Sequence, residues 1–186
     1  MVEPVSTVSW VPVVGVLLGF AASTIAEYLR DRRTSKRERE AREAARKVQV
    51  AERRISFQRD TLLNLQEAVA EEARSAGLIS LADEMEYRKT GKWQGQLLPE
   101  GLAEKARNNT VRTLMLTERV RDKEIRDLTK VFRSYVNQVG NCCSFEDEQI
   151  AIQKMGNAIP ALQGRIGLVL RQLDDDEDTE TEKRKT

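Results

Sequence analysis

The side chains that most often carry out chemistry are scarce in this chain of 186 residues. It contains no histidine, which excludes Ser-His-Asp and Cys-His catalysis and zinc sites that use histidine. Its only cysteines, Cys142 and Cys143, are neighbours, and adjacent cysteines bridge each other only in a strained geometry. We therefore expect two reduced thiols, with a redox or metal-binding role as the alternative.

Motifs for nucleotide binding and carboxylate chemistry give no stronger signal. Gly91-Lys92 lacks both the upstream glycine and the following hydroxyl of a phosphate-binding loop. Acidic pairs such as Glu71-Glu72 are plentiful, but nothing around them marks a pocket. The sequence therefore predicts a protein that is not an enzyme and that binds no cofactor and no metal ion.

The elements that would position any functional surface begin with an uncharged run. No charged side chain occurs between Glu3 and Glu27, which is enough helix to cross a bilayer core of about twenty residues. Trp10 and Tyr28 lie near the two ends, where amphipathic rings favour the membrane interface. Residues 1–29 are thus predicted to be a membrane anchor, with a cleavable signal peptide and a buried soluble helix as alternatives.

The charges around this run predict its orientation. The leader before the run carries Glu3 and no basic residue, unlike the basic start of a secretory signal. Arginines follow the run directly, so the positive-inside rule places the C-terminal side in the cytoplasm. We expect a single pass through the inner (cytoplasmic) membrane, with the N-terminus outside and the rest of the chain inside.

Small residues in the run suggest self-association. Gly15, Gly19 and Ser23 follow one another at intervals of four, and small residues at that spacing let two helices approach closely in lipid. Glycine and alanine are also common in membrane helices that do not pair. The sequence predicts a homo-oligomer whose contact includes these three residues.

Residues 30–47 form a basic segment without large apolar side chains. From Arg30 to Arg59 there are twelve Lys and Arg against five Asp and Glu. Juxtamembrane basic clusters attract anionic lipid, whereas interleaved acids also suit pairing along a helical stalk. The predicted contacts to lipid headgroups or another polyanion are Arg30, Arg32, Arg33, Lys36 and Arg37.

Three heptad-like stripes predict a helical bundle over residues 48–173. The first is Val48, Ala51, Ile55, Gln58, Leu62, Leu65 and Val69. The second is Val111, Leu114, Glu118, Arg121, Ile125, Leu128, Phe132, Tyr135 and Val139. The third is Phe145, Glu148, Ile152, Met155, Ile159, Leu162, Ile166, Val169 and Leu173. The polar middle of the second stripe indicates either less burial there or a shifted face that uses Leu116 and Val120.

Turn residues divide the bundle. We expect Gly77 to end the first long helix, residues 78–90 to add a short fourth helix, and Pro99 to open the second long helix. Gly140 is expected to end that helix, and Ser144 with Asp147 resembles a capping box for the third. The fold class is therefore all-α, with an N-terminal transmembrane helix that continues into a cytoplasmic antiparallel bundle of three long helices and a possible short fourth.

Two further regions could contact a partner. The basic aromatic loop offers Arg88, Lys92 and Trp93, although a Trp packed on the end of the bundle explains the same residues. Gly156 and Gly164 lie off the seam of the third helix, on a face that either packs inside the bundle or receives another helix. The acidic residues 174–186 are predicted to be a disordered tail.

Together these features predict a single-pass, membrane-anchored helical scaffold. It would present its bundle to an unidentified cytoplasmic protein and would self-associate. The alternatives are a small membrane effector that perturbs the bilayer and a soluble helical protein that binds nucleic acid. The second alternative leaves the uncharged run unexplained, so the lipid bilayer, and not a nucleic acid, is the expected partner of the N-terminal part.

Overall fold

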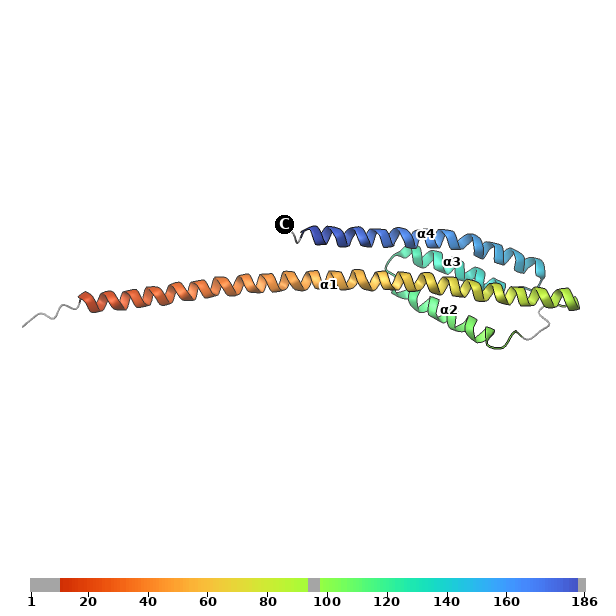
Figure 1. Ribbon diagram of the computed structural model, residues 1–186, viewed down its shortest axis with the longest axis horizontal. Helices are drawn as coiled ribbons and strands as arrows, with labels where there is room; N and C mark the ends of the chain where they lie inside the picture. The colour runs from red at the N-terminus through yellow and green to blue at the C-terminus, as the bar shows by residue number, and fades with distance from the viewer. Residues whose placement is uncertain (1–10, 94–97, 184–186) are drawn as a thin grey trace, which may run out of the picture. The chain divides into compact units, whose positions relative to one another are not determined.

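The computed structural model describes residues 11–93 and 98–183, and it describes side chains for residues 30–93 and 98–179. These residues form four helices and no strand: α1 (Val11–Thr90), α2 (Leu102–Arg119), α3 (Lys123–Val139) and α4 (Phe145–Lys183). Figure 1 colours the helices in chain order, from red at the N-terminus to blue at the C-terminus. The predicted all-α class is confirmed.

The chain divides into two compact units, Met1–Ala51 and Glu52–Thr186. In the first unit, α1 is rich in Arg, Glu and Ala, which are strong helix formers, and the side chains from Arg30 to Lys47 are all exposed. The second unit contains the rest of α1 together with α2, α3 and α4.

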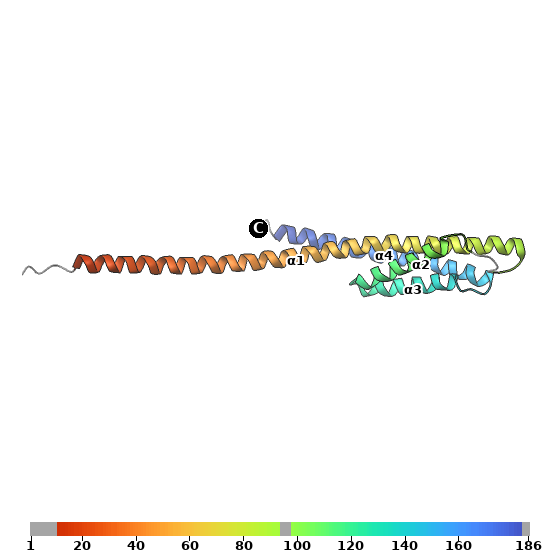
Figure 2. The same ribbon diagram turned by 90° about the horizontal axis from the view of Figure 1, so that it is seen from below.

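The second unit is an antiparallel four-helix bundle, in which α2, α3 and α4 lie along the α1 residues of that unit in both views (Figures 1 and 2). Gln58 of α1 accepts from the backbone N–H of Arg121 just beyond α2, and Ser75 near the other end contacts Asn109. These two contacts mean that α2 runs antiparallel to α1. Gln66 binds Gln163 and Ser80 binds Glu148, so α4 is antiparallel to α1 as well.

The core of the bundle follows the first and third predicted stripes and the second half of the second stripe. Leu62, Leu65, Val69, Phe132, Leu162 and Ile166 are each at most 1% exposed. Burying one such side chain contributes about 1.5–3 kcal/mol to folding. The predicted cap at Ser144 is confirmed, since Ser144 Oγ accepts from the backbone N–H of Asp147 at 3.1 Å. The Asp147 carboxylate accepts from the Ser144 hydroxyl at 2.9 Å.

The predicted helix end at Gly77 is wrong, and residues 78–90 are not a separate helix. α1 continues to Thr90, and Gly91 follows with φ +70°, its N–H bonding the carbonyl of Tyr87 at 2.8 Å. Glycine inside a helix costs only about 1 kcal/mol relative to alanine. Burial of Ser80 and Asp83 beyond Gly77 shows that tertiary contacts continue through this part of α1.

The single second helix predicted up to Gly140 is also wrong. α2 ends at Arg119, Val120 is extended at φ −73° and ψ 128°, and α3 begins after Asp122. The polar residues in the middle of the second stripe, Glu118 and Arg121, therefore lie where the chain turns back between α2 and α3. Its second half, from Ile125 to Val139, faces the core as expected, but Val111 and Leu114 in its first half are exposed.

The acidic segment differs from the expectation as well. α4 runs through Pro160 without a break and continues to Lys183, into residues predicted to be disordered. Arg59 of α1 explains part of this order, because its guanidinium lies 2.6 Å from carboxylate oxygens of both Asp174 and Glu177. Interaction with a cation on α1 offsets the charge repulsion that the composition alone implies.

Among the residues that the structure describes, no helix combines the length and the apolar character needed to cross a membrane. The predicted anchor, residues 1–29, falls on residues 1–10 and on the side chains of residues 11–29, which lie outside the described part of the chain.

Candidate functional site

The basic segment of α1 presents its charges to solvent. Lys36 pairs with Glu40 at 3.9 Å and Arg42 with Glu38 at 3.6 Å, both along the helix. Within the described residues, Arg30, Arg32, Arg33 and Arg37 form no ion pair, so these four guanidinium groups are free to meet an external anion. Of the five predicted contacts, only Lys36 is partly satisfied within the chain.

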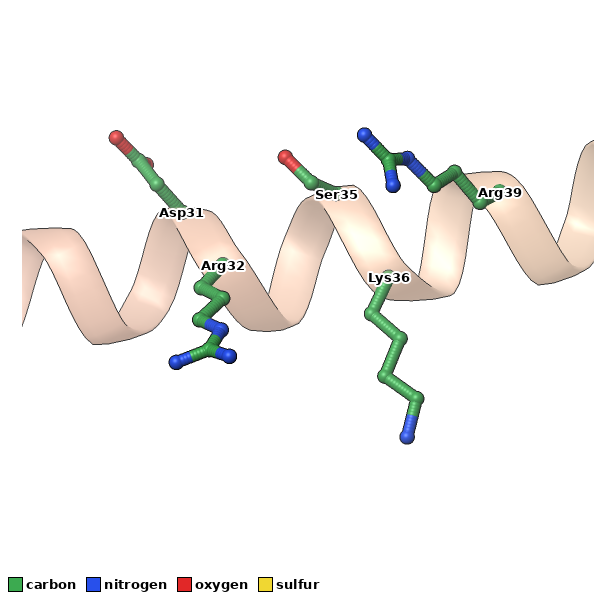
Figure 3. Close-up of a pocket in the computed structure, with 5 residues that line it drawn as sticks. All are labelled: Asp31, Arg32, Ser35, Lys36 and Arg39. Carbon is green, nitrogen blue, oxygen red and sulfur yellow. The ribbon is translucent and has the colours of Figure 1, made fainter.

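A surface hollow on this helix is lined by Asp31, Arg32, Ser35, Lys36 and Arg39. Figure 3 shows that Asp31, Ser35 and Arg39 leave one side of the helix, whereas Arg32 and Lys36 leave the opposite side. The five side chains therefore do not converge on one ligand. Such an arrangement suits an extended anionic surface better than a small anion.

An aromatic cluster closes the end of the bundle. Tyr87 stacks on Phe145 with ring centroids 5.8 Å apart, and Trp93 meets both rings edge to face. The Trp93 indole N–H donates to the carbonyl of Cys142 at 3.0 Å. The Trp93 ring is thus part of the internal packing between the end of α1 and the α3–α4 connection.

The charged neighbours of this cluster remain at the surface. Arg88 is exposed and pairs with Glu84 one turn earlier, and Lys92 is exposed in the turn after Gly91. Cys142 and Cys143 are free thiols on the adjoining connection, and Cys142 donates to the carbonyl of Gln138 at 2.8 Å. Arg88 and Lys92 stay the predicted partner contacts of this end.

The outer face of α4 carries Gly156 and Gly164, both exposed. A Cβ added at either position would meet no atom within 4 Å. Pro160 and Ala161 between them are also exposed, so these small residues do not pack inside the bundle. Whether another helix docks here stays a prediction, and Gly15, Gly19 and Ser23 have side chains outside those described.

Three buried carboxylates, Glu72, Asp83 and Glu148, were not predicted as site residues. Glu72 on α1 is 2% exposed, accepts from Thr110 Oγ1 at 3.0 Å and lies 3.6 Å from the Arg133 guanidinium. Glu148 on α4 is fully buried and accepts from Ser80 Oγ at 2.7 Å. Glu148 interrupts an apolar stripe, and that pattern was the available signal for its burial.

The environment of Glu148 favours its neutral form. Burial penalises the carboxylate and raises its pKa, the Ser80 hydrogen bond opposes this, and the charges of Asp83 and Glu84 raise the pKa further. Asp83 is itself buried, which raises its pKa as well. In the described residues no group of three or more Cys, Asp or Glu side chains could hold a metal ion.

No protein-family model matches the chain, and no curated protein and no solved structure shows significant similarity to it.

Proposed function

We propose that this chain is a single-pass, membrane-anchored helical scaffold that presents its bundle to a protein partner in the cytoplasm and self-associates. The observation that carries the proposal is the order of features along one helix. An uncharged run from Pro4 to Ala26 is followed by a basic segment and then by the bundle, and α1 continues from Val11 to Thr90.

The basic segment supports the same proposal. Residues 30–51 extend about 33 Å as a helix, at 1.5 Å per residue. Their arginines follow the uncharged run, on the side that the positive-inside rule assigns to the cytoplasm. Free guanidinium groups at Arg30, Arg32 and Arg33 suit anionic headgroups, each worth about 1 kcal/mol near the surface.

Membrane extraction of the full-length chain tests the anchor. We expect the tagged protein to stay in the pellet after an alkaline carbonate wash. Protease added to inverted vesicles should remove the C-terminal tag, because the bundle faces the cytoplasm. The matched variant carries Val16→Arg with Leu17→Arg, and two charges at mid-bilayer cost about 2.5–3.5 kcal/mol each. We expect this variant to be released.

Recovery of the unmodified chain in the carbonate supernatant would contradict the anchor. If the unmodified chain and the double-arginine variant both stay in the pellet, the uncharged run does not hold the chain in the membrane. A tag protected in inverted vesicles but cleaved in intact spheroplasts would reverse the proposed topology.

A further inference from the structure

The helix α2 presents its large apolar residues to solvent. Val111, Leu114 and Met115 are 48%, 42% and 55% exposed, whereas Thr113 and Thr117 are buried. A bundle helix ordinarily turns its apolar stripe inward and its polar residues outward. Of the large apolar residues of α2, only Leu116 packs against the core. Val111, Leu114 and Met115 lie on the outer face, which has no covering element among the described residues.

Polar contacts hold α2 to α1. Asn109 donates to Ser75 Oγ at 2.8 Å, Thr110 donates to Glu72 Oε1 at 3.0 Å, and Arg112 lies 2.6 Å from Glu67 Oε2. The buried threonine hydroxyls donate to carbonyls one turn earlier in α2. The inner face of α2 is therefore satisfied without the three apolar side chains on the outer face.

The charges around the outer face are self-complementary. Arg107 precedes Val111 by one turn, and Glu118 follows Leu114 by one turn. If two copies of α2 lie antiparallel about an axis midway between residues 112 and 113, Val111 faces Leu114 of the other copy and Arg107 faces Glu118. A parallel alignment would instead set each charge against its own kind.

These charges are available for such a contact. Arg107, Glu118 and Glu104 are exposed, and none forms an ion pair within the part of the chain that the structure describes. The exposed acids on the apolar face disfavour an anionic lipid surface, since membrane-surface helices carry mainly basic residues on the polar face. A second copy of this chain satisfies both the apolar residues and the charges of both signs.

We propose that α2 is a self-docking surface through which two copies of this chain pair antiparallel. Val111, Leu114 and Met115 form the apolar centre, and reciprocal Arg107–Glu118 ion pairs close both ends. The contact is isologous, so each favourable pair occurs twice. A helix of 18 residues is about 27 Å long, and one pair of such helices makes a small interface and a reversible dimer. This contact does not rest on the proposed anchor.

Site-specific cross-linking of the full-length chain in detergent micelles tests the pairing. One copy carries Val111→Cys and the other Leu114→Cys, both with Cys142→Ser and Cys143→Ser, and a short thiol cross-linker is added to the mixture. We expect a cross-linked heterodimer. The control mixture pairs Val111→Cys with Val131→Cys, a similarly exposed residue of α3 at 46%. Chance encounters would give both mixtures the same yield.

Charge reversal separates pairing from misfolding. Arg107→Glu or Glu118→Arg alone should lower the yield at least about tenfold, because like charges then meet at both ends. The two changes together should restore it. A yield no higher than in the control mixture, or no recovery in the double variant, overturns the proposal. Loss of the carbonate-resistant anchor would leave this readout unaffected, since the cross-link reports only on α2.

Discussion

At the scale of single residues, the buried carboxyl of Glu148 is expected to contribute to the pH dependence of the stability of the bundle. One oxygen of Glu148 accepts from Ser80, and the other has no hydrogen-bond partner within the described structure. Asp83 and Glu84 of α1 add negative charge nearby. Each of these neighbours opposes ionisation of Glu148, so folding favours its protonated form.

The raised pKa of Glu148 determines the sign of the pH effect. A carboxyl whose pKa is higher in the folded than in the unfolded state stabilises the fold fully below the unfolded value, about 4.3. That contribution is lost as the pH rises through the folded pKa. The buried Asp83, whose pKa is also raised, acts in the same direction.

We predict that Glu148→Gln stabilises the bundle near pH 7.5 and flattens the fall of its melting temperature with rising pH. An amide keeps an oxygen that accepts from Ser80 and removes the buried charge. In the original protein one oxygen of Glu148 is unsatisfied, and leaving a buried polar group unsatisfied costs about 1–3 kcal/mol. One kcal/mol corresponds to about 2–4 °C in a chain of this size. Thermal melts between pH 5 and 8 measure the effect.

The matched control is Glu146→Gln, an exposed position on the same helix. It should change the free energy of unfolding by no more than about 0.5 kcal/mol, as surface changes usually do. A Glu148→Gln variant that is less stable at pH 7.5 and keeps the original pH slope would show that the Glu148 carboxylate is satisfied when ionised.

At the scale of elements, the reversal between α2 and α3 depends on Asp122. Its carboxylate accepts from the backbone N–H of Ile125 at 2.8 Å, which caps α3, and it lies 2.6 Å from the Arg165 guanidinium on α4. Burial would raise the pKa of Asp122, but these hydrogen bonds outweigh it and lower the pKa. Its stabilising effect is therefore lost as the pH falls, opposite in sign to that of Glu148.

We predict that Asp122→Ala lowers the free energy of unfolding by about 1–2 kcal/mol for the lost cap, with a further loss from the missing Asp122–Arg165 ion pair. Asp122→Asn keeps the capping oxygen and loses only the charge, so it should fall between the alanine variant and the original. Urea denaturation at pH 7 gives the three values. Equal stability of all three proteins would remove Asp122 from the determinants of this turn.

At the scale of the whole molecule, two separate contacts are proposed for self-association. One uses Gly15 and Gly19 in the uncharged run, and the other uses the outer face of α2. The two contacts share no residue. Each can therefore be removed while the other is measured.

We predict that Gly15→Ile with Gly19→Ile abolishes most of the association signal in a membrane two-hybrid assay, because bulky side chains keep the two helices apart. Ala21→Ile, which falls on the opposite side of the same helix, should leave the signal intact. The α2 cross-link should form at an undiminished yield in the double isoleucine variant. An unchanged two-hybrid signal would contradict the role of the two glycines.

Much of this fold could be predicted from periodicity and turn chemistry. The stripes from Leu62 to Val69 and from Phe145 to Leu173 predicted which faces are buried, because only one side of a helix can reach a shared core. Ser144 with Asp147 predicted the start of α4, since a capping box satisfies local backbone groups. The basic surface at Arg30, Arg32 and Arg33 also followed from composition alone, because nothing in that segment can bury it.

Only the tertiary structure decided the remaining features. Gly77 does not end α1, because packing beyond it outweighs a local penalty of about 1 kcal/mol. Asp122 starts a new helix because its carboxylate meets both the Ile125 N–H and Arg165, which lies 43 residues away. The face of α2 that carries Asn109 and Thr110 turns inward, and Val111 outward, because Ser75 and Glu72 of α1 provide partners for these two polar side chains. The sequence by itself determined the helical periodicity of the segments that form the core, and long-range contacts determined where the helices stop, which way α2 faces and that α4 continues into the acidic segment.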